Sequence, residues 1–125
     1  MPDDLLGGVF GQIRSALEDW VERKDYVRSV GCAELSESIG VIPQQLQAYC
    51  RYVFHMSYKV WRTHLRMEEA RRMLDERPDL LVKQVSAEVG IYDLGNFCST
   101  FKEIYGVTPV EWRQGLRRHS EMSVF

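Results

Sequence analysis

Apolar residues recur every three to four positions along most of this chain, which predicts a protein built from amphipathic helices. The first such stretch predicts a helix from about Val9 to Lys24. Its apolar face comprises Val9, Ile13, Ala16, Leu17 and Trp20. One apolar face on an otherwise polar helix indicates a structural role at the edge of a core.

Two shorter helices are predicted next, with a glycine between them. The first covers roughly residues 32–39 and ends at Gly40, where the chain can turn with a positive φ. The second starts at Pro43, whose missing N–H costs nothing in the first turn of a helix. Its core-facing positions are Leu46, Tyr49 and Cys50. Its outward face is polar, can form bidentate hydrogen bonds, and carries Gln44, Gln45, Gln47, Ala48 and Arg51.

A longer helix is predicted up to about Glu76. Ser57 can cap its start, and it stops before Pro78 because a residue that precedes proline is pushed out of the α region. Its apolar residues form two clusters on nearly opposite sides at ~100° per residue. The first cluster comprises Tyr58, Trp61 and Leu65, and the second comprises Met67, Ala70 and Leu74. This pattern is typical of a helix held by a different lobe at each end. Its length of about 30 Å is close to the ~34 Å between successive major grooves on one face of B-DNA.

The remaining pattern predicts three more helices. One lies near Val82 to Val89 and precedes a turn at Gly90, and another runs from about Asp93 to Tyr105. The sequence Thr108-Pro109-Val110-Glu111 is a capping box with proline at the first helical position, so it marks the start of the last helix. We expect that helix to end between residues 115 and 119.

The two halves of the chain repeat each other at an offset of about fifty residues. Residues 36–41 (SESIGV) match residues 86–91 (SAEVGI). After a slip of one residue, Leu46, Arg51, Met56, Ser57, Trp61 and Arg62 match Phe97, Lys102, Val107, Thr108, Trp112 and Arg113. Each copy has the outline of a helix-turn-helix, the motif that lays its second helix in a DNA major groove.

These elements predict an all-α fold of about seven helices, with two helix-turn-helix lobes joined by a long linker helix. The predicted segments are an N-terminal extension (1–8), the first lobe (9–57), the linker helix (58–77), the second lobe (78–119) and a tail (120–125). At 125 residues, 45% of them hydrophobic, the chain can bury a core but is too short for several independent domains.

The charge of the chain is unevenly distributed. The formal net charge is −2, which argues against a general nucleic-acid binder. Residues 1–40 hold four basic and eight acidic side chains, whereas residues 41–77 hold seven basic and four acidic ones. Such a local excess can supply phosphate contacts, or it can solvate an exposed helix. If it contacts roughly 4 to 6 phosphates, the log-log salt slope of DNA affinity is about −4 to −5.

Other functional classes find little support in the sequence. Cys32, Cys50 and Cys98 are far apart and show no metal-ligand spacing to a histidine, so we expect reduced, packed thiols and no metal or other cofactor. No glycine-rich phosphate loop, acid pair or nucleophile-base arrangement is present, so an enzyme is not expected. Asp3 and Asp4 stand where a signal peptide would be basic, and no apolar run approaches the ~20 residues of a membrane span. We therefore expect a cytoplasmic protein.

Three segments together resemble a known family. They are Trp61–Leu74 (WRTHLRMEEARRML), Val85–Ile91 (VSAEVGI) and the pattern Phe97-(x)3-Phe101-Lys102-(x)3-Gly106-Val107-(x)-Pro109-(x)2-Trp112-Arg113. They look like the DNA-binding domain of AraC/XylS-type bacterial transcription regulators, and the similarity covers about residues 9–113. The resemblance implies seven helices, two helix-turn-helix lobes bridged by a linker helix, and binding to double-stranded promoter DNA, commonly as an activator that touches RNA polymerase.

The resemblance also implies which residues contact bases. In the first lobe these are Gln44 and Gln47, with Arg51 as a further candidate and Gln45 beside them on the same polar face. Glutamine can pair bidentately with adenine, and arginine with guanine or a phosphate. The corresponding positions of the second lobe are Leu94, Gly95, Asn96 and Ser99, of which Asn96 and Ser99 are the candidate contacts. We expect the first lobe to specify sequence and the second mainly to anchor.

Polar and basic residues around these helices are the candidate phosphate contacts. They are Ser57, Lys59, Arg62, Thr100, Lys102, Thr108 and Arg113. Arg66 and Arg113 have an equally good alternative role as structural partners of Glu68, Glu69 or Glu111. Surface glutamines likewise have the plain alternative of solvation.

The chain departs from the family pattern at several positions. Ile42 stands where a Ser or Thr cap is usual, Cys50 replaces a common Phe, and His55 replaces a common Gly. Tyr92 also sits at a usual cap position, although Asp93 beside it can cap instead.

Family members usually carry a separate ligand-sensing or dimerising domain, which does not fit in 125 residues. The chain is then either an excised output domain or a small stand-alone regulator. The alternative function is a helix-turn-helix scaffold that has lost DNA readout and serves as a protein-protein interaction module. The weak second-lobe set and the acidic first segment favour that alternative.

Overall fold

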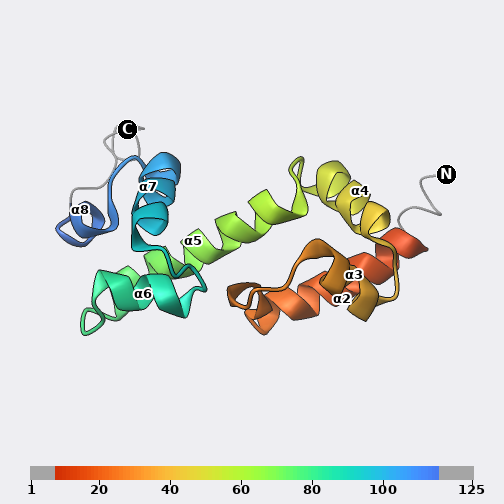
Figure 1. Ribbon diagram of the computed structural model, residues 1–125, viewed down its shortest axis with the longest axis horizontal. Helices are drawn as coiled ribbons and strands as arrows, with labels where there is room; N and C mark the ends of the chain where they lie inside the picture. Colours follow the sequence, from red (N-terminus) through yellow and green to blue (C-terminus); the bar gives the residue numbers. More distant parts are fainter. Residues whose placement is uncertain (1–7, 116–125) are drawn as a thin grey trace. The chain divides into compact units, whose positions relative to one another are not determined.

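The structure is a computed structural model that describes residues 8–115. Within that range it contains seven α-helices, one short 3-10 helix and no strand (Figure 1). The helices are α2 (Val9–Glu22), η1 (Asp25–Val27), α3 (Cys32–Ile39), α4 (Pro43–Val53), α5 (Tyr58–Glu76), α6 (Val82–Glu88), α7 (Leu94–Tyr105) and α8 (Pro109–Arg113). The predicted all-α class with two helix-turn-helix motifs is confirmed.

The chain forms two compact units that meet within α5, between Leu65 and Arg66. Unit 1 contains α2 to α4 and the first half of α5, and unit 2 contains the second half of α5 and α6 to α8. The two predicted apolar clusters of the long helix divide at this point. Tyr58 and Trp61 are buried in unit 1, and Met67, Ala70 and Leu74 are buried in unit 2. Each cluster therefore belongs to a different core, as the pattern predicts.

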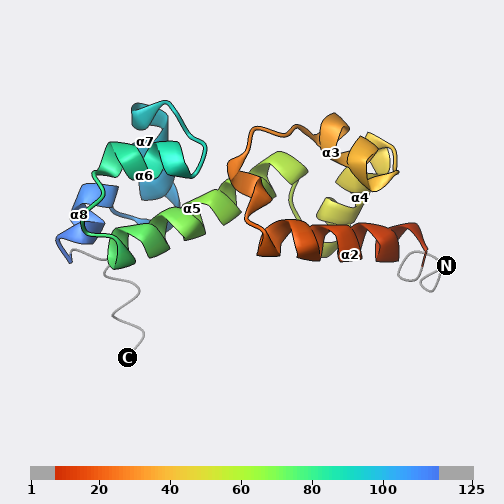
Figure 2. The same cartoon turned by 90° about the horizontal axis from the view of Figure 1, so that it is seen from below.

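The core of unit 1 is rich in aromatic side chains. The apolar face of α2 packs against α3 and α4, and Figure 2 shows α2 running alongside these helices. Trp61 stacks on Phe54 with ring centroids 4.4 Å apart and lies 5.6 Å from Trp20. The predicted inward positions of α4 are all buried, namely Leu46, Tyr49 and Cys50. Phe10 joins the predicted face of α2 and contacts Tyr49 edge to face.

Unit 2 repeats this arrangement. Helix α7 packs against α6 and α8, and its inward face buries Phe97 and Phe101. Trp112 of α8 is buried beside Phe101, and its indole N–H donates to Asp75 Oδ1 at 3.0 Å. Arg71 lies over the rings of Tyr105 and Trp112, where it covers the edge of this core.

Both helix-turn-helix turns depend on a glycine. Gly40 and Gly90 have φ angles of +93° and +87°, a conformation that costs a residue with a Cβ atom about 1–2 kcal/mol. In each turn the amide that follows the glycine donates to the carbonyl of the serine five residues earlier, Val41 to Ser36 at 3.0 Å and Ile91 to Ser86 at 2.9 Å. The sequence repeat is therefore a repeat of turn geometry.

Equivalent arginines tie each unit together. Arg62 Nη1 donates to the carbonyl of Val30, in the segment before α3, at 2.9 Å. Arg113 donates to the carbonyls of Leu80 and Arg77, in the segment before α6, at 2.6 and 3.0 Å. In both units the helix that follows the turn motif is thus fastened to the segment that precedes it.

The structure corrects the predicted boundaries at three places. The first helix ends at Glu22 instead of Lys24, because Lys24 adopts a left-handed conformation with φ +58° and leads into η1, an element with no signal in the pattern. Helix α6 ends at Glu88, one residue before the predicted end. Helix α8 ends at Arg113, before the predicted range of 115–119, because the chain turns at Gly115 with φ +87°. Residues 1–7 of the predicted extension (1–8), residues 116–119 of the predicted second lobe and the predicted tail (120–125) lie outside the described residues.

Two glycines of unit 2 give a matched test of the turn. Gly90→Ala should lower the free energy of unfolding by about 1–2 kcal/mol, because the alanine must adopt a left-handed conformation. Gly95→Ala, in the first turn of α7, should raise the free energy of unfolding by about 0.5–1 kcal/mol, because alanine favours the helix. The added Cβ causes no clash, since its nearest neighbour lies at an ordinary contact distance of 3.4 Å. Chemical denaturation of both variants measures the difference. Equal effects of the two substitutions would contradict the proposed role of the turn.

Candidate nucleic-acid interface

Helices α4 and α7 present equivalent stripes of exposed residues. Gln44, Ala48 and Arg51 share one side of α4, and all three are exposed. The same positions of the repeat on α7 are Gly95, Ser99 and Lys102, which are also exposed. We call these two sets the outer stripes. Each ends in a basic residue in the last turn of its helix.

Two of the three predicted glutamines have internal hydrogen bonds. Gln45 Oε1 accepts from the backbone amide of Ile42 at 3.0 Å, which caps the start of α4 where the usual Ser or Thr is missing. Gln47 Oε1 accepts from the backbone amide of Tyr58 at 3.1 Å, across the turn to the start of α5. Both oxygens thus satisfy helix N-termini.

These hydrogen bonds determine which glutamine side chains have both polar groups free to contact a base. Bidentate recognition of adenine needs the carbonyl and the amino group of one glutamine side chain together. Gln47 can supply both only by giving up its bond to Tyr58. Gln44 is exposed and makes no hydrogen bond among the described residues, so both of its groups are available.

The candidate contacts of α7 are also engaged in part. Asp93 Oδ1 accepts from the backbone amide of Asn96 at 3.0 Å, so Asp93 caps α7 as predicted. The Thr100 hydroxyl donates to Asn96 Oδ1 at 3.4 Å, and the Ser99 hydroxyl donates to the Gly95 carbonyl at 2.8 Å. The polar groups of α7 therefore bond mostly within their own helix.

Most basic residues of the predicted excess are bound within the protein. Arg62 lies over the ring of Tyr58, 5.6 Å from its centroid, and binds the Val30 carbonyl. Arg66 is buried and donates to the Gly90 carbonyl at 3.3 Å. Arg72 bridges Glu69 and Glu76 on α5. The cations that remain exposed without an internal partner at or beside the outer stripes are Arg51, Lys59 and Lys102.

Arg66 and Arg113 thus have structural roles, as one sequence hypothesis proposed. The partners of Arg113 are backbone carbonyls, however, and not the acidic side chain of Glu111. That carboxylate accepts from the Thr108 amide at 2.9 Å, and the amide and hydroxyl of Thr108 hold the pKa of Glu111 below its ordinary value.

Ser57 and Thr108 occupy equivalent helix caps. Ser57 Oγ accepts from the Val60 amide at 3.3 Å, and Thr108 Oγ1 accepts from the Glu111 amide at 3.1 Å. The predicted caps of α5 and α8 are confirmed. The Ser57 hydroxyl keeps its proton for donation, whereas the Thr108 hydroxyl also interacts with the Glu111 carboxylate. A phosphate contact remains a prediction for both residues.

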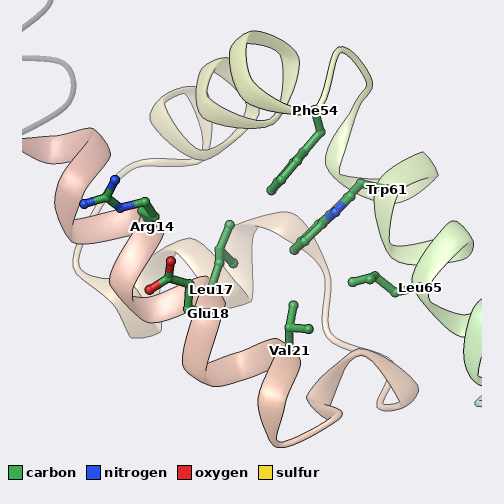
Figure 3. A pocket seen from close by; sticks show the side chains of 7 residues that line it. All are labelled: Arg14, Leu17, Glu18, Val21, Phe54, Trp61 and Leu65. Carbon is green, nitrogen blue, oxygen red and sulfur yellow. The ribbon is translucent and has the colours of Figure 1, made fainter.

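Unit 1 also has an open groove beside its aromatic stack. Figure 3 shows Leu17 and Val21 of α2 facing Phe54 and Trp61, with Arg14 and Glu18 at the rim. The groove has a volume of about 380 Å³, and Leu65 completes its lining. It consists mainly of the exposed sides of residues that also pack in the core.

Thiol, metal and membrane sites find no support among residues 8–115. All three cysteines are free, and burial raises their pKa values, that of Cys50 to about 12, so they stay protonated at neutral pH. No group of histidine, cysteine and acidic side chains in this range could hold a metal ion. Its helices are too short or too polar for any of them to cross a membrane.

Comparisons with known proteins agree with this geometry. A family model described as a helix-turn-helix domain matches residues 35–115. Three solved structures share the fold at 20–23% identity. A DNA-binding transcriptional dual regulator from Escherichia coli K-12 has 20% identity and a TM-score of 0.70, over 82% of this chain and 89% of that one.

The other two structures are C-terminal domains of response regulators. That of AraT from Geobacillus stearothermophilus has 22% identity and a TM-score of 0.73, over 83% of this chain and 84% of that one. That of yesN from Fusobacterium nucleatum subsp. nucleatum ATCC 25586 has 23% identity and a TM-score of 0.71, over 80% and 96% of the two chains. No curated protein sequence matches the chain.

Gln44 and Gln47 should respond differently to substitution. Gln47→Ala removes the acceptor of the Tyr58 amide and should lower the free energy of unfolding by about 1 kcal/mol, as loss of a helix cap does. Gln44→Ala should change it by less than about 0.5 kcal/mol, because that side chain is exposed. Urea denaturation measures both. Identical unfolding curves for Gln47→Ala and the unchanged protein would show that the bond does not matter.

Proposed function

Because the chain belongs to the helix-turn-helix domain family, and there to the AraC type, we propose that this DNA-binding transcription regulator reads bases through the outer stripe of α4. The outer stripe of α7 enters a second major groove and mainly anchors. The partner is double-stranded DNA.

The observation that carries the proposal is the equivalence of the two outer stripes. Both recognition helices bury their inner faces and leave the three equivalent outward positions exposed, with a basic residue in the last turn. A helix can enter a major groove only if such a face is free. A terminal cation can then reach guanine or a backbone phosphate.

The two stripes differ in what they offer to bases. Gln44 and Arg51 lie seven residues apart on α4, about 10 Å along the helix, and each can form bidentate contacts. On α7 the same positions are Gly95 and Lys102, and Ser99 bonds within the helix. Base-specific hydrogen bonds should therefore come mainly from α4.

Two further parts of the proposal come from the resemblance alone. We propose that the bound protein activates transcription by touching RNA polymerase. We also propose that a separate sensor domain or a dimer partner sets when it binds. The runner-up function, a protein-interaction module without DNA readout, is an outcome of the binding experiments below.

Site selection with purified variants tests the assignment of the two stripes. Gln44→Ala and Arg51→Ala should each relax the preference at particular base pairs of one half of the site, by about 1–3 kcal/mol per lost bidentate contact. Lys102→Ala should weaken binding to all DNA sequences alike, and Ser99→Ala should change the affinity and the preference little. If Ser99→Ala or Asn96→Ala removed the preference while Gln44→Ala left it intact, the assignment would be reversed. No preference for any sequence at any salt concentration would favour the interaction module.

The salt dependence of binding counts the cations that reach phosphate. With Arg51 assigned to a base, Lys59 and Lys102 are available for phosphate, so about two phosphates are contacted. The log-log slope should be about −2 instead of the −4 to −5 expected from sequence. Fluorescence anisotropy at a series of salt concentrations measures it. Lys59→Ala should reduce the slope by about one, whereas a slope near zero would contradict DNA binding by this surface.

A further inference from the structure

We propose that unit 2 recognises thymine, through contact between the C5-methyl group and an apolar edge formed by Tyr92 and Leu94. The inference rests on the proposed function, because it assumes that α7 enters a major groove. It gives a sequence preference to α7, a helix whose polar side chains offer few hydrogen bonds to bases.

The two side chains are unusually exposed for their size and type. Tyr92 is 79% exposed and Leu94 is 42% exposed, and they flank Asp93, the residue that caps α7. Single exposed apolar residues are common on protein surfaces. This pair, however, stands at the start of a recognition helix, the end that contacts base edges in helix-turn-helix proteins. In unit 1 the cap residue of α4 itself is apolar, and this residue, Ile42, is 56% exposed.

Gly95, the next residue, leaves space beside this edge. Its φ is not positive, and an added Cβ would meet only Asp93 Oδ1, at an ordinary contact distance of 3.4 Å. Neither the backbone nor the packing of the protein therefore requires glycine here, although glycine weakens a helix. A position without a side chain lets another molecule approach the helix closely, and here it adjoins the two apolar side chains.

Thymine is the base that suits this surface. Its C5-methyl is the one apolar group that a base pair of standard DNA presents in the major groove. Two hydrogen-bonding groups nearby are engaged, Asn96 Oδ1 with Thr100 and the Ser99 hydroxyl with the Gly95 carbonyl, which leaves the Asn96 amino group. Without its oxygen, Asn96 cannot pair bidentately with adenine, so contact with the methyl group is the main discrimination left to this end of α7.

The position of the edge favours DNA over a protein partner. Leu94 is the first residue of α7 and Tyr92 lies two residues before it, so the edge adjoins Gly95, the first residue of the outer stripe proposed for DNA. Two side chains are also far fewer than the ~20–30 residues that each partner contributes to a stable protein interface.

The experiment uses the duplex selected by the full chain, with each thymine replaced in turn by deoxyuridine, which lacks only the methyl group. Fluorescence anisotropy at fixed salt gives the Kd for each duplex. We expect at least one replacement to weaken binding about fourfold, the effect of one buried methyl group. The double variant Tyr92→Ser/Leu94→Ala should bind that thymine duplex and its deoxyuridine counterpart equally.

Val110→Ala is the matched control. Val110 is 50% exposed and lies in the same unit, on α8, so this variant should keep the fourfold difference. Thermal melting checks that the variants are folded. If the unchanged protein binds a preferred sequence but is insensitive to every replacement, this inference alone is overturned. A sensitivity that persists in the double variant also overturns it. If no sequence is preferred, the proposed function fails together with it.

Discussion

Helix α5 has to complete two cores, and the rest of the structure depends on that constraint. Its first turns bury Tyr58 and Trp61 in unit 1, and its later turns bury Met67, Ala70 and Leu74 in unit 2. At ~100° per residue these sets fall on nearly opposite sides, so one helix can serve as the last helix of one motif and the first helix of the next. Each end of α5 is held by a side chain from the unit to which that end belongs. Gln47 accepts from the first amide of α5, and the Trp112 indole donates to Asp75 in the last turn.

The same constraint determines which cations are left for DNA. The helix that closes each motif must be fastened to the segment before it, and equivalent arginines, Arg62 and Arg113, do this by donating to backbone carbonyls. A guanidinium used in this way is a poor phosphate ligand, because backbone carbonyls of its own unit already hold it and its Nε atom is buried. A segment with seven basic residues therefore offers far fewer free charges than its composition indicates. The interface that remains is small, and most of its base-specific potential lies in Gln44 and Arg51.

The features that the sequence predicted are those with local causes. Gly40, Pro43, Ser57 and Thr108 mark turns and helix starts through their own backbone preferences or through bonds to residues three or fewer positions away. The resemblance identified the family, and the periodicity identified both clusters of α5. The roles of Gln47 and Arg62 were not predictable in the same way, because their partners lie eleven and thirty-two residues away and the pattern carries no signal for them. The left-handed Lys24 likewise has no sequence signal, since lysine rarely adopts that conformation.

Nuclear magnetic resonance of the labelled chain, titrated with its selected duplex, tests the central claim most directly. The claim is that DNA lies against the exposed faces of α4 and α7. It predicts large shifts of the Gln44 and Asn96 side-chain amide signals, with little change for the Trp61 indole at the groove of unit 1. Shifts confined to that groove, or none at either recognition helix while the duplex is bound, would contradict it.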